Sequence, residues 1–167
     1  MAPQLKLYTV LSYILIPIAL FFAFLDIALL LSSLANASVL IMVFVIACLV
    51  IYTFASFKFL KAGIEKEIAQ TAKLKDWIKV NAYVSFFLCS LFFINAISVL
   101  ISSDIVLLKF IDEFLESQPS IPKELTSALM LSLLKGVSVF LLITGMVGLM
   151  HIRTSLRLLK QYAYLFE

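Results

Sequence analysis

The chain of 167 residues contains little charge, glycine, proline, histidine or cysteine. Only 14% of its residues are charged, against about a quarter in an average soluble domain. Four glycines and four prolines are too few for a disordered or linker-rich chain. Together with a mean hydropathy of +1.13, this composition excludes a soluble globular domain and indicates an integral membrane protein.

Motifs for catalysis and metal binding are also missing. The sequence contains no His-Glu-x-x-His, no Cys-x-x-Cys and no glycine-rich phosphate loop. Its only histidine, His151, stands near Arg153 at the end of an apolar stretch, where we expect an interfacial or helix-terminal role. Cys48 and Cys89 are isolated within apolar stretches and are expected to be free, buried thiols. The sequence therefore predicts a protein that is not an enzyme, with no catalytic residues, metal or cofactor.

Four long apolar stretches make up most of the chain. They cover residues 7–34, 38–58, 79–102 and 125–151. As helices, rising about 1.5 Å per residue, they can each cross a hydrocarbon core about 30 Å thick. The alternation of a membrane β-barrel is absent, so the prediction is an all-α, polytopic integral membrane four-helix bundle forming a single domain, 1–167. A weak match of residues 12–33 with 82–103 is compatible with a duplicated helical hairpin.

The distribution of charge predicts the orientation of these spans. Basic residues gather before the first stretch, in segment 58–79 with its six lysines, and in the C-terminal extension 152–167. Segment 102–124 has five acids and only two lysines. Because lysine and arginine in short loops resist translocation, both termini and segment 58–79 are expected in the cytoplasm. The same rule accounts for the basic total charge, so no nucleic-acid partner is predicted.

An amphipathic helix is predicted at 104–117, in the acidic loop between the third and fourth spans. Its apolar positions recur at helical spacing, and the other face carries Lys109, Asp112, Glu113 and Glu116. The apolar positions are Leu107, Leu108, Ile111, Phe114 and Leu115. Such a helix can lie among lipid headgroups or dock against a partner. Interfacial helices usually carry lysine and arginine, whereas this one is acidic, so docking is the favoured interpretation.

Three polar residues fall within the predicted spans. Asp26, Asn95 and Lys135 lie at a similar depth, counted from the outer ends of their helices. We expect Asp26 and Lys135 to form an ion pair, with Asn95 as a hydrogen-bonding neighbour, because an unpaired charge in hydrocarbon is costly. The layer can be a ligand-binding site open to the outside, or a buried pair that only fixes helix register.

Two further sets of residues indicate contacts of the fourth span. Small residues at close-packing spacing predict contact with another helix, either within the bundle or in self-association; they are Ser132, Gly136, Thr144, Gly145 and Gly148. Beyond the span, a basic stripe predicts contact with lipid headgroups, with partner docking as the alternative; it consists of Arg153, Arg157 and Lys160.

The sequence therefore favours a non-enzymatic membrane protein, an accessory or scaffold subunit that packs against another membrane protein or itself. The alternative is a small transport or ligand-binding protein that uses Asp26, Asn95 and Lys135. Membrane lipids and a membrane-protein partner or homo-oligomer are the expected partners. The arrangement resembles that of small bacterial inner-membrane proteins built from two hairpins joined by a charged cytoplasmic loop, which implies that location. Without paired extracellular cysteines, the chain differs from tetraspanin-like and claudin-like proteins.

Cysteine labelling tests this orientation. A Ser120→Cys variant should react with a membrane-impermeant thiol reagent added outside, because the acidic loop is expected there. A Thr71→Cys variant should react only after the membrane has been opened. The unchanged chain, with Cys48 and Cys89, measures the background. The reverse labelling pattern would overturn the predicted topology.

Overall fold

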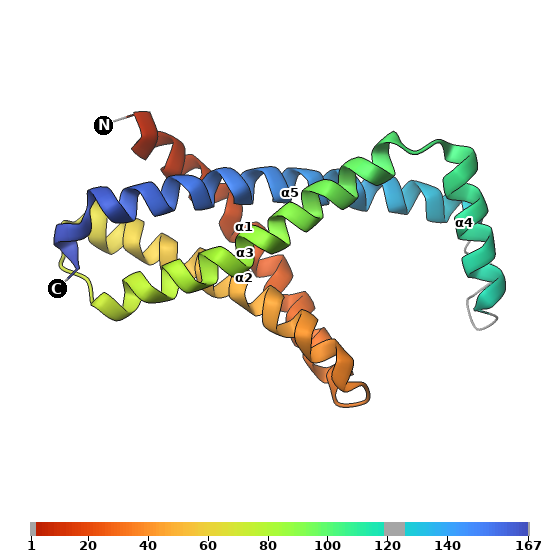
Figure 1. Cartoon of the computed structure of the whole chain (residues 1–167), viewed down its shortest axis with the longest axis horizontal. Helices are drawn as coiled ribbons and strands as arrows, with labels where there is room; N and C mark the ends of the chain where they lie inside the picture. Colours follow the sequence, from red (N-terminus) through yellow and green to blue (C-terminus); the bar gives the residue numbers. More distant parts are fainter. Residues whose placement is uncertain (1–2, 119–125, 167) are drawn as a thin grey trace. The chain divides into compact units, whose positions relative to one another are not determined.

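The computed structural model describes residues 3–118 and 126–166. These residues form long helices, α1 (Pro3–Ser33), α2 (Leu40–Lys58), α3 (Ala72–Ile101) and α5 (Ser127–Gln161), and the shorter α4 (Asp104–Ser117) (Figure 1). Short helical turns follow at η1 (Ala37–Val39), η2 (Phe59–Ile64) and η3 (Ala163–Leu165). The prediction of an all-α chain is confirmed.

Four helical segments are long and apolar enough to cross a membrane, as predicted. These candidate spans are Gln4–Ser33, Ala37–Ile64, Ala72–Ile101 and Ser127–Gln161. The third begins seven residues before the predicted 79, and the fourth runs ten residues beyond 151. The helices are longer than the predicted spans because hydropathy detects only their apolar parts. Lysine and arginine are good helix formers, so a helix can continue beyond its apolar part. The predicted start of the fourth span, at residue 125, lies outside the described residues.

The chain divides into two compact units. Unit 1 contains residues 1–90 and 146–167, and unit 2 contains residues 91–145. Unit 1 therefore holds α1, α2, the first part of α3 and the last part of α5. Unit 2 holds the rest of α3 and α5 together with α4. The single domain expected from the sequence stays a prediction.

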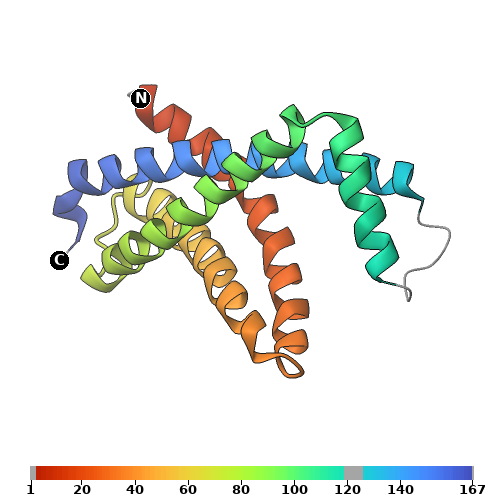
Figure 2. The same cartoon turned by 45° about the vertical axis from the view of Figure 1, so that its right-hand side comes forward.

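In unit 1, α1 and α2 form a helical hairpin and lie side by side (Figures 1 and 2). The turn is short because Asn36 stops one helix and starts the next. Its side-chain Oδ1 accepts hydrogen bonds from the Ser38 backbone N at 3.1 Å and from the Ser38 Oγ at 2.7 Å. An asparagine that binds the backbone two residues ahead is a typical helix N-cap. The hairpin thus brings the apolar faces of α1 and α2 together.

The C-terminal segment packs back onto unit 1. Helix α2 continues into the π-helix η2, and the backbone N of Gln70 then donates to the O of Leu165 at 2.6 Å. The rings of Phe59 and Phe166 lie 5.2 Å apart between centroids. Leu165 is buried. The end of the chain therefore contributes Leu165 to the core of unit 1.

Gly148 marks a close contact between α3 and α5 within unit 1. A Cβ atom placed on Gly148 would clash with the Cys89 Sγ, so a larger residue does not fit without movement. Both Cys48 and Cys89 are free and buried, as expected. A Cβ atom placed on Gly136, in contrast, would have no described atom within 4 Å beyond its chain neighbours and its own helix backbone. Of these two small residues, Gly148 alone makes a close helix contact.

In unit 2, α4 folds beside the start of α5 (Figure 2). Asp104 in the first turn of α4 forms an ion pair with Lys135, with 2.5 Å between Oδ1 and Nζ. Asp112 accepts a hydrogen bond from Ser127. Leu107 and Ile111 are buried. Two polar contacts and two apolar side chains thus fix the position of α4 within unit 2.

Substitution of Gly148 tests the α3–α5 contact. Gly148→Ala should lower the free energy of unfolding by about 1–3 kcal/mol, because overpacking a filled core forces side chains to shift. Cys89→Ala should restore much of that loss in the double variant, since only the Cβ of residue 89, at 3.5 Å, remains near the new methyl group. The measurement is thermal or denaturant unfolding in a mild detergent.

Gly136→Ala is the matched control. It adds the same methyl group to the same helix in open space, so it should be neutral or slightly stabilising through helix propensity. Equal destabilisation at both glycines would show that helix α5 responds to any added methyl group, and that the Cys89 contact is not the cause.

Candidate functional site

Polar side chains from three helices meet in the core of unit 1. Each helix contributes an aromatic ring and, four residues later, a serine, so both groups lie on one helix face. They are Tyr8 and Ser12 on α1, Tyr52 and Ser56 on α2, and His151 and Ser155 on α5. All six are buried. We call these six residues the histidine network.

His151 lies at the centre of the histidine network. Its Nδ1 is 2.7 Å from the Tyr52 hydroxyl, and its Nε2 is 2.9 Å from the Ser12 Oγ. The Ser12 hydroxyl donates its hydrogen to the Tyr8 carbonyl at 2.8 Å, so it accepts from His151. Tyr52 must then donate to Nδ1. These bonds assign a neutral imidazole with its hydrogen on Nε2.

Tyr8 covers the imidazole and extends the network. Its ring stacks on His151 with 4.7 Å between centroids and 22° between planes. Its hydroxyl donates to the Ser56 carbonyl at 3.0 Å and lies 3.5 Å from the Ser155 Oγ. The hydrogen bonds of the His151 ring and of the Tyr8 hydroxyl each join two different helices. The network therefore connects α1, α2 and α5.

The geometry favours a structural role for the histidine network over nucleophilic chemistry. A serine nucleophile must give its hydrogen to the histidine, whereas the Ser12 hydrogen points to a backbone carbonyl. No part of the His151 side chain is exposed to solvent. Among the described residues, no three His, Cys, Asp or Glu side chains are grouped so that they could hold a metal ion.

The sequence-based interpretation of His151 was wrong. We expected an interfacial or helix-terminal residue, whereas His151 is 0% exposed and lies about three turns before the end of α5 at Gln161. The hydropathy of the fourth span does not indicate that His151 is buried, because one polar residue hardly changes the average over a span. The signal present in the sequence is a polar ring, of tyrosine or histidine, followed four residues later by a serine, at Tyr8, Tyr52 and His151.

The predicted polar layer is divided between the two units. Lys135 has Asp104 as its ion-pair partner, a carboxylate that the prediction did not include. The Asn95 amide donates to the Leu91 carbonyl of its own helix at 2.8 Å. Asp26, in unit 1, has its Oδ1 shielded from solvent without a hydrogen-bond partner in the described chain. The pairing of Asp26 with Lys135 stays a prediction.

The small residues of α5 have different surroundings. Ser132 and Gly136 are exposed, whereas Thr144, Gly145 and Gly148 are buried. The Thr144 Oγ1 is shielded and makes no hydrogen bond among the described residues. The segment 132–136 therefore leaves a small-residue surface open, while the segment 144–148 is covered.

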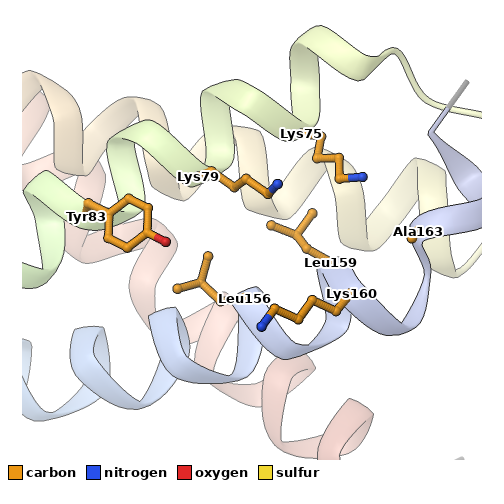
Figure 3. Close-up of a pocket in the computed structure, with 7 residues that line it drawn as sticks. All are labelled: Lys75, Lys79, Tyr83, Leu156, Leu159, Lys160 and Ala163. Carbon is orange, nitrogen blue, oxygen red and sulfur yellow. The ribbon is translucent and has the colours of Figure 1, made fainter.

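The predicted basic stripe lies on the exposed side of α5. Arg153, Arg157 and Lys160 are all exposed. Lys160 also lines a pocket in unit 1 together with Lys75 and Lys79 of α3 (Figure 3). Sequence analysis did not connect these lysines, because Lys79 and Lys160 are 81 positions apart and only the packing of α3 beside α5 brings them together.

Comparisons of the chain with protein-family models, with curated proteins and with solved structures find no match. The interpretation of its sites therefore depends on their own chemistry.

Removing one hydroxyl tests the histidine network. Tyr52→Phe should lower the free energy of unfolding by about 1–3 kcal/mol, because the buried His151 Nδ1 is left without a donor. Tyr164→Phe removes the same group from an exposed tyrosine and should change stability by less than about 0.5 kcal/mol. Thermal unfolding in detergent measures both. Equal stability of the two variants would contradict the proposed Tyr52–His151 hydrogen bond.

Proposed function

We propose that the chain is a multi-pass integral membrane protein with both termini in the cytoplasm, and that it acts without catalysis as an accessory or scaffold subunit. Only 17% to 33% of the most apolar window of each candidate span is buried, so most of this apolar surface needs lipid or another protein around it. The basic segments 58–79 and 152–167 support a cytoplasmic position of both termini. The bacterial inner membrane is the proposed location.

The outer face of α4 is the observation that supports a subunit role. Val106, Phe110 and Phe114 are 62%, 66% and 43% exposed and recur every four residues, which puts them on one face of the helix. Helix α4 has only 14 residues, too few for it to span a bilayer. Contiguous exposed aromatic side chains on such a helix are typical of a surface that binds a partner.

This face differs from the docking set expected from the sequence. Leu107 and Ile111 are buried, and Leu108 and Leu115 are partly buried. Of the predicted docking residues, Phe114 is the exposed one. The proposed docking face therefore consists of Val106, Phe110 and Phe114, and the other predicted residues hold α4 in unit 2.

Charge favours a protein over a lipid surface as the occupant of the docking face. Glu113 and Glu116 are exposed on α4, and neither has an ion-pair partner in the part of the chain that the structure describes. Interfacial helices usually carry lysine and arginine, whereas α4 carries four acids and one lysine, and a protein surface with lysine or arginine at its rim would be attracted to it. We therefore propose a partner membrane protein with an apolar patch and a basic rim.

The shielded carboxylate of Asp26 supports an alternative function. A carboxylate oxygen in a candidate span that lacks a partner in the described chain could accept a hydrogen bond or a cation from a ligand. A small transport or ligand-binding protein that uses Asp26, with Asn95 and Lys135, is therefore the second proposal.

Native mass spectrometry of the full chain, extracted in a mild detergent or in native lipid discs, tests the subunit role. A second protein or a second copy should accompany the wild-type chain. Phe110→Ser with Phe114→Ser should weaken that association by about tenfold or more, because aromatic anchors carry much of the energy of an interface. Phe110→Leu with Phe114→Leu keeps the face apolar and should retain most of the partner.

A lone monomer that carries a defined small molecule would contradict the subunit role and support the ligand-binding alternative. An Asp26→Asn variant that then loses the small molecule would locate its site. A partner retained equally by the serine and leucine variants would show that the association uses a surface other than α4.

A further inference from the structure

Three lysines from two helices line one pocket of unit 1. Lys75 and Lys79 come from α3, and Lys160 comes from α5 (Figure 3). Tyr83, Leu156, Leu159 and Ala163 complete the lining of this pocket, which has a volume of about 420 Å³. We call it the lysine pocket. No acidic side chain is among its lining residues.

The helix geometry explains why the lysines converge. Lys75, Lys79 and Tyr83 are spaced four residues apart and therefore share one face of α3. Helix α5 ends at Gln161 beside the start of α3, so the two helices run antiparallel here. Figure 3 shows Lys79 and Tyr83 on one side, Lys160 on the other, and Leu156 and Leu159 between them. The pocket thus has a polar rim and an apolar centre.

The positive charge of the lysine pocket is not neutralised within the described chain. The ion pairs among the described residues are Lys61–Glu65 and Lys135–Asp104, and neither involves a lysine of the pocket. Lys75 instead places its Nζ 5.5 Å from the centroid of the Phe166 ring. Three ammonium groups around one hollow repel each other, so an anion between them would be stabilising.

A second, mostly apolar hollow lies between the same two helices and shares one lining residue with the lysine pocket. It is lined by Phe86 of α3 and by five residues of α5, and its volume is about 430 Å³. The α5 residues are Leu149, Met150, Ile152, Arg153 and Leu156. Leu156 lines both hollows, so they adjoin. Phe86 lies about two turns further along α3 than Lys79, towards the middle of the candidate span.

We infer that the lysine pocket binds the phosphate group of an anionic phospholipid, with an acyl chain in the apolar hollow beside Phe86 and Leu156. This inference rests on the proposed insertion of the chain into a membrane. The lysines lie near the ends of two candidate spans that we place on the cytoplasmic side, at the level expected for headgroups. The Tyr83 side chain adds a hydroxyl that can donate to a phosphate oxygen.

The apolar hollow distinguishes a phospholipid from a soluble phosphate. A free phosphate monoester would use the three lysines and would gain nothing from the surface around Phe86, Leu149 and Ile152. A phospholipid uses both hollows, and burying its chain adds favourable free energy for each methylene group. The adjacency of a cationic and an apolar hollow on one pair of helices is therefore the feature that favours lipid.

Lipid binding by the full-length chain in detergent tests the inference, with native mass spectrometry counting bound molecules. The probes are phosphatidylglycerol, phosphatidylcholine with the same acyl chains, and soluble glycerol 3-phosphate. The test variant combines Lys75→Gln, Lys79→Gln and Lys160→Gln. The control variant combines Lys58→Gln, Lys66→Gln and Lys73→Gln, which removes the same charge from the same predicted side of the membrane but outside the pocket.

The wild-type chain and the control variant should prefer phosphatidylglycerol, and the test variant should bind it about 100-fold more weakly, or about fivefold for each lysine removed alone. The single variants keep the inference testable if the triple variant does not fold, which thermal unfolding reports. Equal loss in the test and control variants would overturn the inference, since charge alone would then explain binding. Lysine-dependent binding of glycerol 3-phosphate with the affinity of the lipid would overturn lipid as the source of the phosphate.

Membrane extraction separates this inference from the proposed function. Wild-type chain that resists alkaline extraction from membranes but shows no lysine-dependent lipid binding would overturn the lysine-pocket inference and leave membrane insertion standing. Chain released by alkali would overturn the proposed insertion, and with it the lipid inference.

Discussion

The hydrogen bonds of the His151 imidazole are the interaction on which the rest of unit 1 depends. Ser12 of α1 and Tyr52 of α2 bind its two nitrogens, so one ring of α5 fixes the position of the hairpin. In an apolar interior an unpaired nitrogen is costly, and this makes a shifted register of α5 unfavourable. The contact of Gly148 with Cys89 and the hollows between α3 and α5 both need α5 in that register.

Polar contacts in unit 2 are exposed. Lys135 pairs with Asp104 of α4, and Asp112 binds Ser127, so polar contacts fix the amphipathic helix against α5. Leu107 and Ile111 add apolar contact, which leaves Val106, Phe110 and Phe114 on the outer face. The contacts that position α4 therefore also decide which of its faces stays exposed.

The proposals concern different surfaces of one chain. The exposed face of α4 is apolar, and the helix carries four acids and one lysine, which suits a basic protein partner. The lysine pocket is cationic and adjoins a mostly apolar hollow, which suits an anionic lipid. A scaffold subunit that holds both a partner and a lipid needs no catalytic group, and the closed hydrogen bonding of His151 is compatible with that role.

Hydropathy and 3.6-residue periodicity are local properties, so they were enough to predict the helical class, the four long apolar helices and the bounds of α4. These local properties do not determine which helix faces meet. Counting depth put Lys135 level with Asp26, but depth carries no information on direction around a helix axis, and Asp104 lies within reach of Lys135. Only the tertiary structure joined the three ring–serine pairs around His151 and brought Lys79 and Lys160 to one pocket, since such contacts between distant segments depend on how whole helices pack.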